Sequence, residues 1–229
     1  MSLLDLLFPR HCLGCGQTGS YFCPACLNLI AVAPDRICPI CQKGSFGGLT
    51  HPGCLTPRGL DGLTTIFPYG GLIEKAIKKI KYQFVTDLGS ELVELFLSFV
   101  GEDEAFTRFC QGKPVLVPIP LHPSRLRWRG FNQSELLGRL IAANLKLDFA
   151  PNLLARVKNT KPQVELDKKD RQGNIRGAFQ VNKNFQFSIS NFQFIVFDDV
   201  WTSGATIREA AKVFKRHGAK KVWGLALAR

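Results

Sequence analysis

Two acidic side chains stand next to each other at the end of an apolar run near the C-terminus. The stretch IVFDDVWTSGAT (195–206) places Asp198 and Asp199 before a Thr-Ser-Gly turn, and a helical pattern follows the turn. A turn that opens a helix presents unpaired backbone N–H groups, which bind phosphate. Glycine allows close backbone approach and the hydroxyl groups add donors. The predicted phosphate-binding residues are Thr202, Ser203, Gly204, Ala205 and Thr206.

The acid pair needs a different ligand, because carboxylates repel a phosphate. Vicinal hydroxyl groups or a hydrated Mg²⁺ both suit Asp198 and Asp199. A ribose 5-phosphate carries both a diol and a phosphate, so residues 198–206 predict a site for such a ligand. The structural alternative is an ordinary capped helix, which explains the Ser and Thr residues but not the two adjacent acids.

Seven of the eight cysteines lie in the first quarter of the chain, and their spacing predicts structural zinc. Three CxxC pairs and one further cysteine make up this group: Cys12, Cys15, Cys23, Cys26, Cys38, Cys41 and Cys54. Such pairs hold tetrahedral Zn²⁺ through thiolates, and in a reducing compartment clustered cysteines indicate metal rather than disulfides. Seven thiolates exceed one site, so a second site needs a histidine; His51, three residues before Cys54, is the best candidate, and His11 is the alternative. The spacing leaves open whether one or two zinc ions bind and which pairs combine.

The segment RLRWRGFNQ (125–133) alternates arginines with aromatic residues. Its candidate nucleic-acid contacts are Arg125, Arg127, Trp128, Arg129 and Phe131. Guanidinium groups pair with phosphates and aromatic rings stack on bases, so the pattern suits a single strand. The structural alternative places both rings in the core and the arginines in water. Residues 113–183 carry a net charge of +9, against +2 for residues 1–60, which also favours a phosphate-bearing partner.

The stretch around the acid pair resembles the phosphoribosyl pyrophosphate (PRPP) motif of type I phosphoribosyltransferases. Further segments, PIPLHPSRLRWRGFNQSELL (118–137) and RGAF (176–179), resemble the ComF family of competence-associated proteins over almost the whole chain. The positions between these segments that carry the resemblance are Arg156, Thr160, Gln163, Leu166, Arg171 and Asn174. The resemblance implies a phosphoribosyltransferase-like domain behind a zinc-binding module, and an association with uptake of single-stranded DNA in natural transformation.

The resemblance also implies roles for individual residues. Mg²⁺-PRPP would place its ribose hydroxyls on Asp198 and Asp199 and its 5-phosphate on residues 202–206. In the implied fold the loop after the first core strand holds the pyrophosphate, which makes His122 and Arg125 candidate ligands. A helix cap is the structural alternative for His122. The basic segment 156–176 is a candidate for a loop that closes over PRPP, or for a nucleic-acid groove.

Hydrophobic patterns place these residues on an α/β framework. We expect a cysteine-rich module over 1–57 and an α/β domain over 58–229, with a polar connector at 101–113. Strands are predicted within 58–68, 114–120, 192–199 and 220–228, with a further short strand within 148–157. Helices are predicted over 71–83, 89–100, 132–147 and 204–218. Residues 158–190 are expected to be irregular, with a hairpin signal at AFQV. In the first helix the lysines cover the exposed face. Alternating strands and helices predict a parallel sheet flanked by helices, whose ligands bind beyond the carboxyl ends of the strands.

Composition narrows the class of protein. The 229 residues carry a net charge of +12 and are 45% hydrophobic, which excludes a disordered chain. No apolar run reaches the roughly 18 residues of a membrane span. The N-terminal MSLLDLLFPRHC lacks a signal-peptide cleavage site, so we expect a cytoplasmic protein without a membrane span.

Three functions stay open at this point. The first is the handling of single-stranded DNA during uptake, with a PRPP-binding cradle on a transferase fold. The second is an active Mg²⁺-dependent phosphoribosyltransferase that acts on an unidentified acceptor. The third is a zinc-dependent adaptor that docks to a DNA-uptake ATPase, a helicase or another competence protein.

Overall fold

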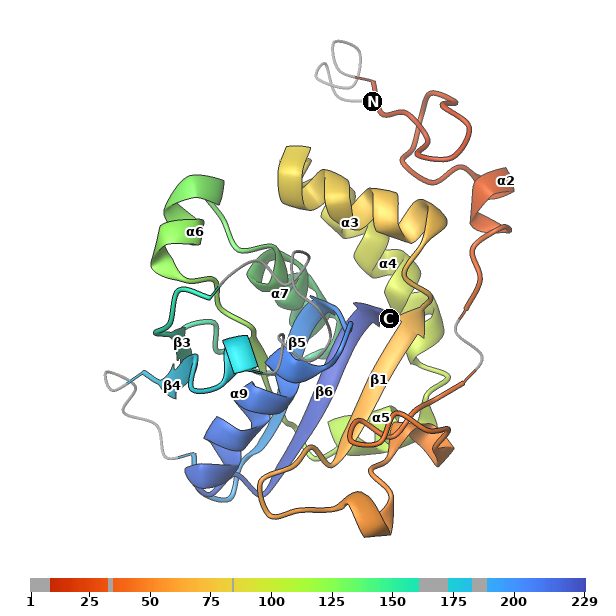
Figure 1. Ribbon diagram of the computed structural model, residues 1–229. Helices are drawn as coiled ribbons and strands as arrows, with labels where there is room; N and C mark the ends of the chain where they lie inside the picture. The colour runs from red at the N-terminus through yellow and green to blue at the C-terminus, as the bar shows by residue number, and fades with distance from the viewer. Residues whose placement is uncertain (1–8, 33–34, 84, 161–172, 183–188) are drawn as a thin grey trace.

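A four-stranded parallel sheet lies at the centre of the molecule. The computed structural model describes residues 9–32, 35–83, 85–160, 173–182 and 189–229. The strands are β1 (Gly62–Phe67), β2 (Val115–Pro118), β5 (Gln193–Val200) and β6 (Lys221–Ala228), in the spatial order β1-β6-β5-β2. Every neighbouring pair is parallel, so the carboxyl ends of all four strands meet at one edge of the sheet (Figure 1).

Helices cover both faces of this sheet and bury alternate strand residues. One face packs against α3 (Gly71–Gln83), α4 (Leu88–Val100), α5 (Glu104–Cys110) and α7 (Gln133–Leu145), and the other packs against α9 (Ala205–Arg216). In β5, Ile195 and Phe197 belong to the first core, while Phe194 and Val196 belong to the second. Because successive strand residues point to opposite faces, one apolar run supplies two cores. None of the helices that the structure describes is long and apolar enough to cross a membrane.

The predicted parallel α/β organisation is confirmed, and two short helices add to it. The connector expected over 101–113 holds α5, because Asp103 accepts a hydrogen bond from the Phe106 N–H at 3.1 Å and so caps the helix. The second addition, α6 (Pro123–Arg129), begins after His122. The hairpin signal at AFQV corresponds to β4 (Phe179–Val181), which pairs antiparallel with β3 (Leu154–Arg156). Of the expected irregular region, 161–172 and 183–188 lie outside the described residues.

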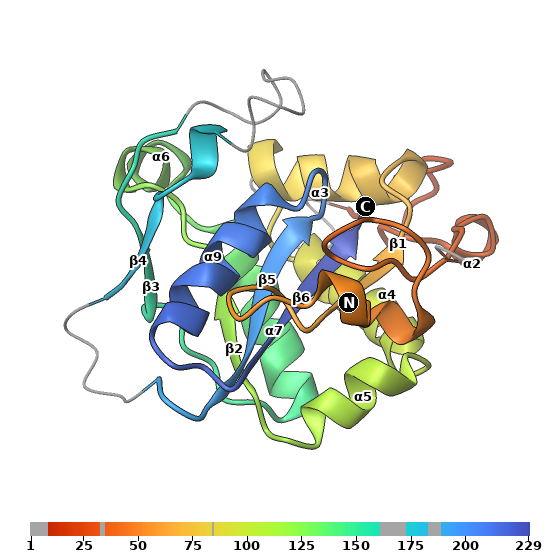
Figure 2. The same cartoon turned by 60° about the horizontal axis from the view of Figure 1, so that its bottom comes forward.

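The cysteine-rich start of the chain has two halves, which contact different parts of the α/β domain. The first half lies beside α3 and α4 (Figure 1), where the Tyr21 hydroxyl donates to Asp87 at 2.9 Å and the Tyr21 N–H donates to Glu91 at 3.0 Å. The second half, orange in Figure 2, packs against β1 and α5, and its Pro39 carbonyl accepts a hydrogen bond from Arg208 of α9. The helices of this region are short: α2 (Pro24–Leu27), η1 (Phe46–Gly48) and η2 (Pro52–Cys54).

A partly buried ion pair and a close backbone contact hold the second half against the sheet. Arg36 Nε lies 3.3 Å from the Asp103 carboxylate, which also accepts from the Thr64 hydroxyl at 3.0 Å. Gly48, with φ of +69°, lies so close to β1 that a Cβ atom would stand 2.0 Å from the Leu63 carbonyl oxygen. The cysteine-rich module therefore packs directly on the sheet, and the division of the chain at residue 57 stays a prediction.

We predict that Gly48→Ala lowers the free energy of unfolding by about 2 kcal/mol or more, because the new methyl group meets backbone and the positive φ disfavours an L side chain. Gly44→Ala is the matched control, since a Cβ atom there has no neighbour within 4 Å, and it should change stability by less than about 0.5 kcal/mol. Urea unfolding of the zinc-loaded protein measures both variants. Equal, small effects would contradict tight packing of the module on β1.

Candidate functional site

The predicted acid pair lies at the carboxyl edge of the sheet in a network with α3 and α7. Asp199, at the end of β5, is 3% exposed and forms an ion pair with the Lys81 ammonium group of α3. Asp198 accepts from the Ser134 hydroxyl at 2.9 Å, and Gln133 Nε2 lies 3.5 Å from Asp199 Oδ1. Lys81, Gln133 and Ser134 were not predicted as site residues, because they lie far from the acid pair in the sequence.

Lys81 corrects the expectation that the lysines of α3 all face solvent. Its side chain is only 19% exposed, because the last turn of α3 passes over the carboxyl edge of the sheet. Lys78, one turn earlier, has a 58% exposed side chain and pairs with Glu74, as expected of a surface lysine. Helical spacing identifies the face that packs on the core, but it does not tell where the end of the helix lies relative to the sheet.

The buried charges change the protonation of Asp198. Burial and the neighbouring Asp199 raise the pKa of Asp198 to about 7, although Lys81 and the Ser134 hydroxyl oppose the shift. Burial alone would lower the pKa of Lys81, but the attraction of Asp199 and Asp198 outweighs it and the pKa is raised. Asp198 therefore exchanges its proton near neutral pH. Ligand hydroxyls that donate to it favour its ionised form.

The turn between β5 and α9 has the open backbone donors expected of a phosphate site. Within the described part of the chain, the N–H groups of residues 202–204 donate to no acceptor. Gly204 has φ of +72°, and a Cβ atom there would stand 2.1 Å from the Trp201 ring, so a larger residue does not fit. Ala205 begins α9, and Thr206 lines the adjoining cleft. The turn has the geometry of an anion site at a helix start.

Arginines line a cleft of about 540 Å³ that opens beside the acid pair. Arg125 donates to the Thr160 carbonyl at 2.7 Å, and Arg156 donates to the Thr160 hydroxyl. Burial and the charge of Arg125 lower the pKa of Arg156 to about 10. An anion bound between the two guanidinium groups would relieve their repulsion, so this wall favours a phosphate-bearing ligand.

Two further predictions for this region concern His122 as a pyrophosphate ligand and residues 156–176 as a closing loop. His122 Nδ1 accepts from the Ser124 N–H at 3.3 Å and so caps α6, which was its structural alternative. It is not among the described residues that line the cleft. The loop predicted over 156–176 is described only at its two ends, since residues 161–172 lie outside the described residues.

Aromatic rings stand at the rim of the cleft. Trp128 is 71% exposed and lines the cleft, which excludes its placement in the core. The Arg129 guanidinium lies 5.4 Å from the centre of the Tyr82 ring, which also lines the cleft. Phe131 packs against the core, as its structural alternative expected, and Arg127 is exposed. Trp128 and Tyr82 thus offer ring faces beside the arginines.

The clustered cysteines form two groups of four ligands. The groups are Cys12, Cys15, Cys23 and Cys26, and Cys38, Cys41, His51 and Cys54, with the ligand atoms of each group within 4.8 Å of one another. Cys15 Sγ lies 3.6 Å from Cys23 Sγ, and Cys41 Sγ lies 3.4 Å from His51 Nδ1. Tetrahedral bonds of about 2.3 Å from zinc to sulfur place ligand atoms about 3.8 Å apart, so both groups fit zinc. His11, the alternative ligand, lies outside both groups.

Backbone donors favour the thiolate form that zinc needs. Burial raises the pKa of the Cys12 thiol, but hydrogen bonds from the N–H groups of Cys23, Cys15 and Gly14 outweigh it and lower the pKa to about 6. The pKa of Cys38 is also lowered, because backbone N–H groups outweigh its burial in the same way. Each group therefore contains a cysteine that is prepared to bind metal.

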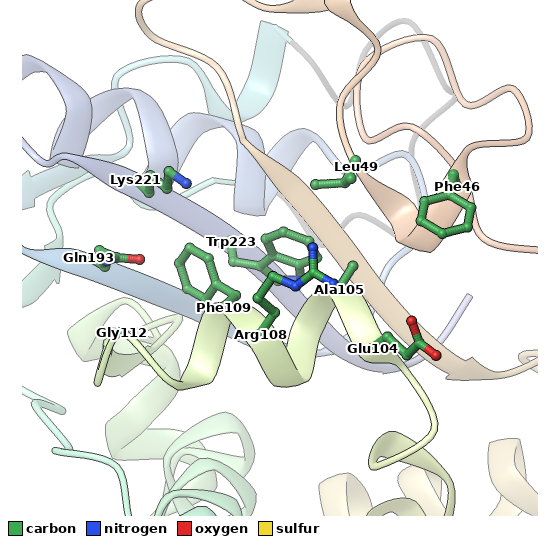
Figure 3. Close-up of a pocket in the computed structure, with 10 residues that line it drawn as sticks. All are labelled: Phe46, Leu49, Glu104, Ala105, Arg108, Phe109, Gly112, Gln193, Lys221 and Trp223. Carbon is green, nitrogen blue, oxygen red and sulfur yellow. The ribbon is translucent and has the colours of Figure 1, made fainter.

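A second cavity, of about 300 Å³, lies at the opposite, amino edge of the sheet. Figure 3 shows Trp223 and Phe109 side by side in its wall, with Arg108 in front of them. Among its described lining residues Glu104 is the only acid. Because parallel sheets bind ligands beyond the carboxyl ends of their strands, the cleft beside the acid pair is the candidate functional site.

We predict that Lys81→Met shifts ligand binding to higher pH. Removing this ammonium group raises the pKa of Asp198 further, because the nearby charge that favours the carboxylate is lost. The affinity for ribose 5-phosphate, which needs ionised Asp198, should then rise with a midpoint about one pH unit higher than in the unmodified protein. Calorimetric titration across neutral pH measures this midpoint.

Lys78→Met, an exposed position on the same helix, is the control and should leave the midpoint in place. The phosphate group of the ligand also titrates near neutral pH, but it does so equally with both variants. A difference in midpoint between them therefore reports on the protein. The same midpoint in both variants would contradict the role given to Asp198.

Comparisons with known proteins agree with this arrangement. A family model described as a double zinc ribbon domain matches residues 3–55. Competence protein F of Haemophilus influenzae is 29% identical over 228 residues, which cover 91% of this chain and 98% of the relative. DNA utilization protein YhgH of Escherichia coli is 28% identical, with 96% and 94% covered. Competence protein ComFC of Streptococcus pneumoniae is 26% identical, with 95% and 99% covered.

These matches extend across the zinc-ligand groups and the α/β domain alike. The family model covers the cysteine-rich start, and the relatives cover nine tenths or more of the chain. The resemblance of this chain to the ComF family, with a double zinc ribbon at its N-terminus, is thereby confirmed over most of its length.

Proposed function

We propose that this protein binds PRPP in the cleft at the carboxyl edge and handles single-stranded DNA during DNA uptake. One observation carries the proposal: an acid pair, an open backbone turn and a wall of arginines adjoin the same cleft. The names of the relatives, competence protein and DNA utilization protein, support the role in DNA uptake.

The groups of PRPP suit the three parts of the cleft. The N–H groups of residues 202–204 would hold the 5-phosphate, because they lack acceptors among the described residues. The ribose hydroxyls would donate to Asp198 and Asp199. Arg125 and Arg156 would hold the pyrophosphate, whose charge offsets their mutual repulsion.

Mg²⁺ would enter on the pyrophosphate rather than on the protein. Asp199 already pairs with Lys81, so a metal ion on Asp199 would have to displace a buried ammonium group. Pyrophosphate oxygens are hard ligands of the kind that Mg²⁺ prefers. The zinc ions have a separate, structural role, and we propose one ion in each ligand group, two for each chain.

Single-stranded DNA would follow the rim of the cleft. The exposed Trp128 would stack on a base, while Arg127 and Arg129 on the same short helix would pair with phosphates. The net charge of +9 over residues 113–183 would attract the phosphate backbone of the strand.

Transfer of the phosphoribosyl group is the second candidate function. The pKa of Asp198 near 7 favours it, since a carboxylate at that pKa accepts a proton from an incoming acceptor at neutral pH. The acceptor would attack the anomeric carbon as the bond to pyrophosphate breaks, and Arg125 would stabilise the leaving group. Release of pyrophosphate from PRPP in the presence of candidate acceptors tests this function.

Docking to an uptake ATPase or helicase through the zinc ribbon stays a prediction. Capture of such a partner by the zinc-loaded protein, and its loss after zinc removal, would test it.

Trp128→Ala should weaken binding of single-stranded DNA by about tenfold, because one stacked base is lost. Phe46→Ala is the matched control: Phe46 is also an exposed aromatic residue, at 85%, but it lies at the opposite edge of the sheet, and its loss should change little. Fluorescence anisotropy with a labelled oligothymidine measures both affinities. Equal affinities for the two variants would exclude stacking at Trp128.

Arg156→Gln should weaken PRPP binding by about tenfold or more, since a charge-assisted contact to pyrophosphate is lost. Arg216→Gln, at an exposed arginine near the end of α9, is the control and should bind as tightly as the unmodified protein. Calorimetry with Mg²⁺-PRPP gives these affinities. No measurable binding to the unmodified protein would overturn the PRPP-binding proposal, whatever the result with DNA.

A further inference from the structure

We infer that the second zinc group positions the phosphate-binding turn, and that Arg208 and Gln42 transmit this effect. The inference deepens the proposed function and rests on it, since it concerns how residues 202–204 are held for a phosphate.

Two side chains from distant parts of the chain converge on one carbonyl oxygen, that of Ser203. Arg208 donates to it through Nη2, and Gln42 donates to it through Nε2 at 3.3 Å. The other terminal nitrogen of Arg208, Nη1, donates to the Pro39 carbonyl at 2.9 Å. Pro39 lies inside the Cys38–Cys41 pair of zinc ligands, so a single guanidinium group joins the zinc site to the turn.

Both side chains are themselves held in place. The Gln42 N–H donates to the Cys38 carbonyl at 2.9 Å, which closes the cysteine loop and places Gln42 directly after the metal ligands. The Arg208 guanidinium lies 5.6 Å from the centre of the ring of Trp201, which is 2% exposed. The position of Gln42 therefore depends on the fold of the zinc site. The guanidinium group of Arg208 is held by its contact with the buried Trp201 ring.

The direction of the Ser203 carbonyl determines the direction of the next N–H. In a trans peptide group, C=O and N–H point in opposite directions. With the Ser203 carbonyl turned to the zinc site, the Gly204 N–H points away from it, and no described residue accepts from this N–H. That orientation leaves the N–H available to a phosphate oxygen.

Glycine makes this orientation easy to lose. Gly204 has φ of +72°, and glycine adopts both signs of φ at little cost, so its peptide group rotates readily unless a contact prevents it. A rotated peptide would turn the Ser203 carbonyl oxygen toward the phosphate and repel it. Arg208 and Gln42 prevent this rotation, which makes them positioning residues for the phosphate site.

The first zinc group has a different environment. Its half of the module contacts α3 and α4, through Tyr21 with Asp87 and Glu91, and through Leu72 beside Cys26 and Cys12. The structure describes no contact from it to the turn at 202–204. Zinc at the second group should therefore affect phosphate binding far more than zinc at the first.

Thermodynamic linkage gives this inference a second consequence. If zinc at the second group strengthens phosphate binding by some factor, PRPP must strengthen zinc binding at that group by the same factor. PRPP should therefore raise the chelator concentration needed at equilibrium to remove one zinc ion of the two, and leave that for the other unchanged.

The test uses the full chain loaded with zinc. Arg208→Gln, with Arg216→Gln on the same helix as its control, and Cys41→Ser, with Cys110→Ser outside both zinc groups as its control, are compared by calorimetry with Mg²⁺-PRPP. We expect about tenfold weaker binding for Arg208→Gln and for Cys41→Ser, and little change for the controls. A colorimetric chelator follows zinc release with and without PRPP, and the amide resonance of Gly204 should move in Arg208→Gln before ligand is added.

Three results would overturn the inference. The first is equal PRPP affinity in Arg208→Gln and Arg216→Gln. The second is a PRPP effect on the release of both zinc ions or of neither. The third is an unchanged Gly204 resonance in Arg208→Gln.

Arg208→Gln keeps every zinc ligand, so it decides the question even if Cys41→Ser does not fold. A protein that binds PRPP but gives any of these results retains the proposed function and loses only the inference. A protein that does not bind PRPP at all loses both.

Discussion

A buried ion pair at the carboxyl end of β5 constrains the architecture of the site. A carboxylate as enclosed as Asp199, which is 3% exposed, costs several kcal/mol unless a partner compensates its charge. Lys81 supplies that charge and Gln133 a polar neighbour. The last turn of α3 and the first turn of α7 must therefore both meet the end of the same strand. Two of the helices that cover this face of the sheet, α3 and α7, are therefore held at the site by contacts with the acid pair.

The remaining charges of the cleft are poorly balanced without a ligand. Asp198 holds its proton up to a pKa of about 7, because burial and Asp199 disfavour a second negative charge. On the other side, burial and Arg125 lower the pKa of Arg156 to about 10. A ligand with hydroxyls at one end and phosphates at the other relieves both imbalances at once. The separation of acidic and basic groups within one cleft would thus favour a sugar phosphate over a simple anion or cation, as proposed above.

Local features of the site were predictable from sequence, and features that depend on long-range packing were not. Three features of the site lie within short stretches of sequence: the acid pair, the turn at 202–204 and the zinc ligands. The structure brings the residues of each feature close together. Lys81 and Gln133 reach the site from separate helices, so no spacing rule identifies them. The helix α5 was missed because a single cap, Asp103, starts it within a polar stretch. His51, which the spacing to Cys54 favoured over His11, completes the second group.

The cysteine-rich module contacts both elements that hold the predicted ligand. Its first half packs on α3, the helix that carries Lys81, where the Lys75 ammonium group donates to the Leu13 carbonyl at 3.3 Å. Its second half reaches the turn, through the hydrogen bond from Gln42 to Ser203. A module of this size buries too little apolar surface to fold on its own core, so zinc must supply much of its stability. Zinc at the second group would thereby contribute to the free energy that holds the turn in place, because only this group is joined to the turn by described hydrogen bonds.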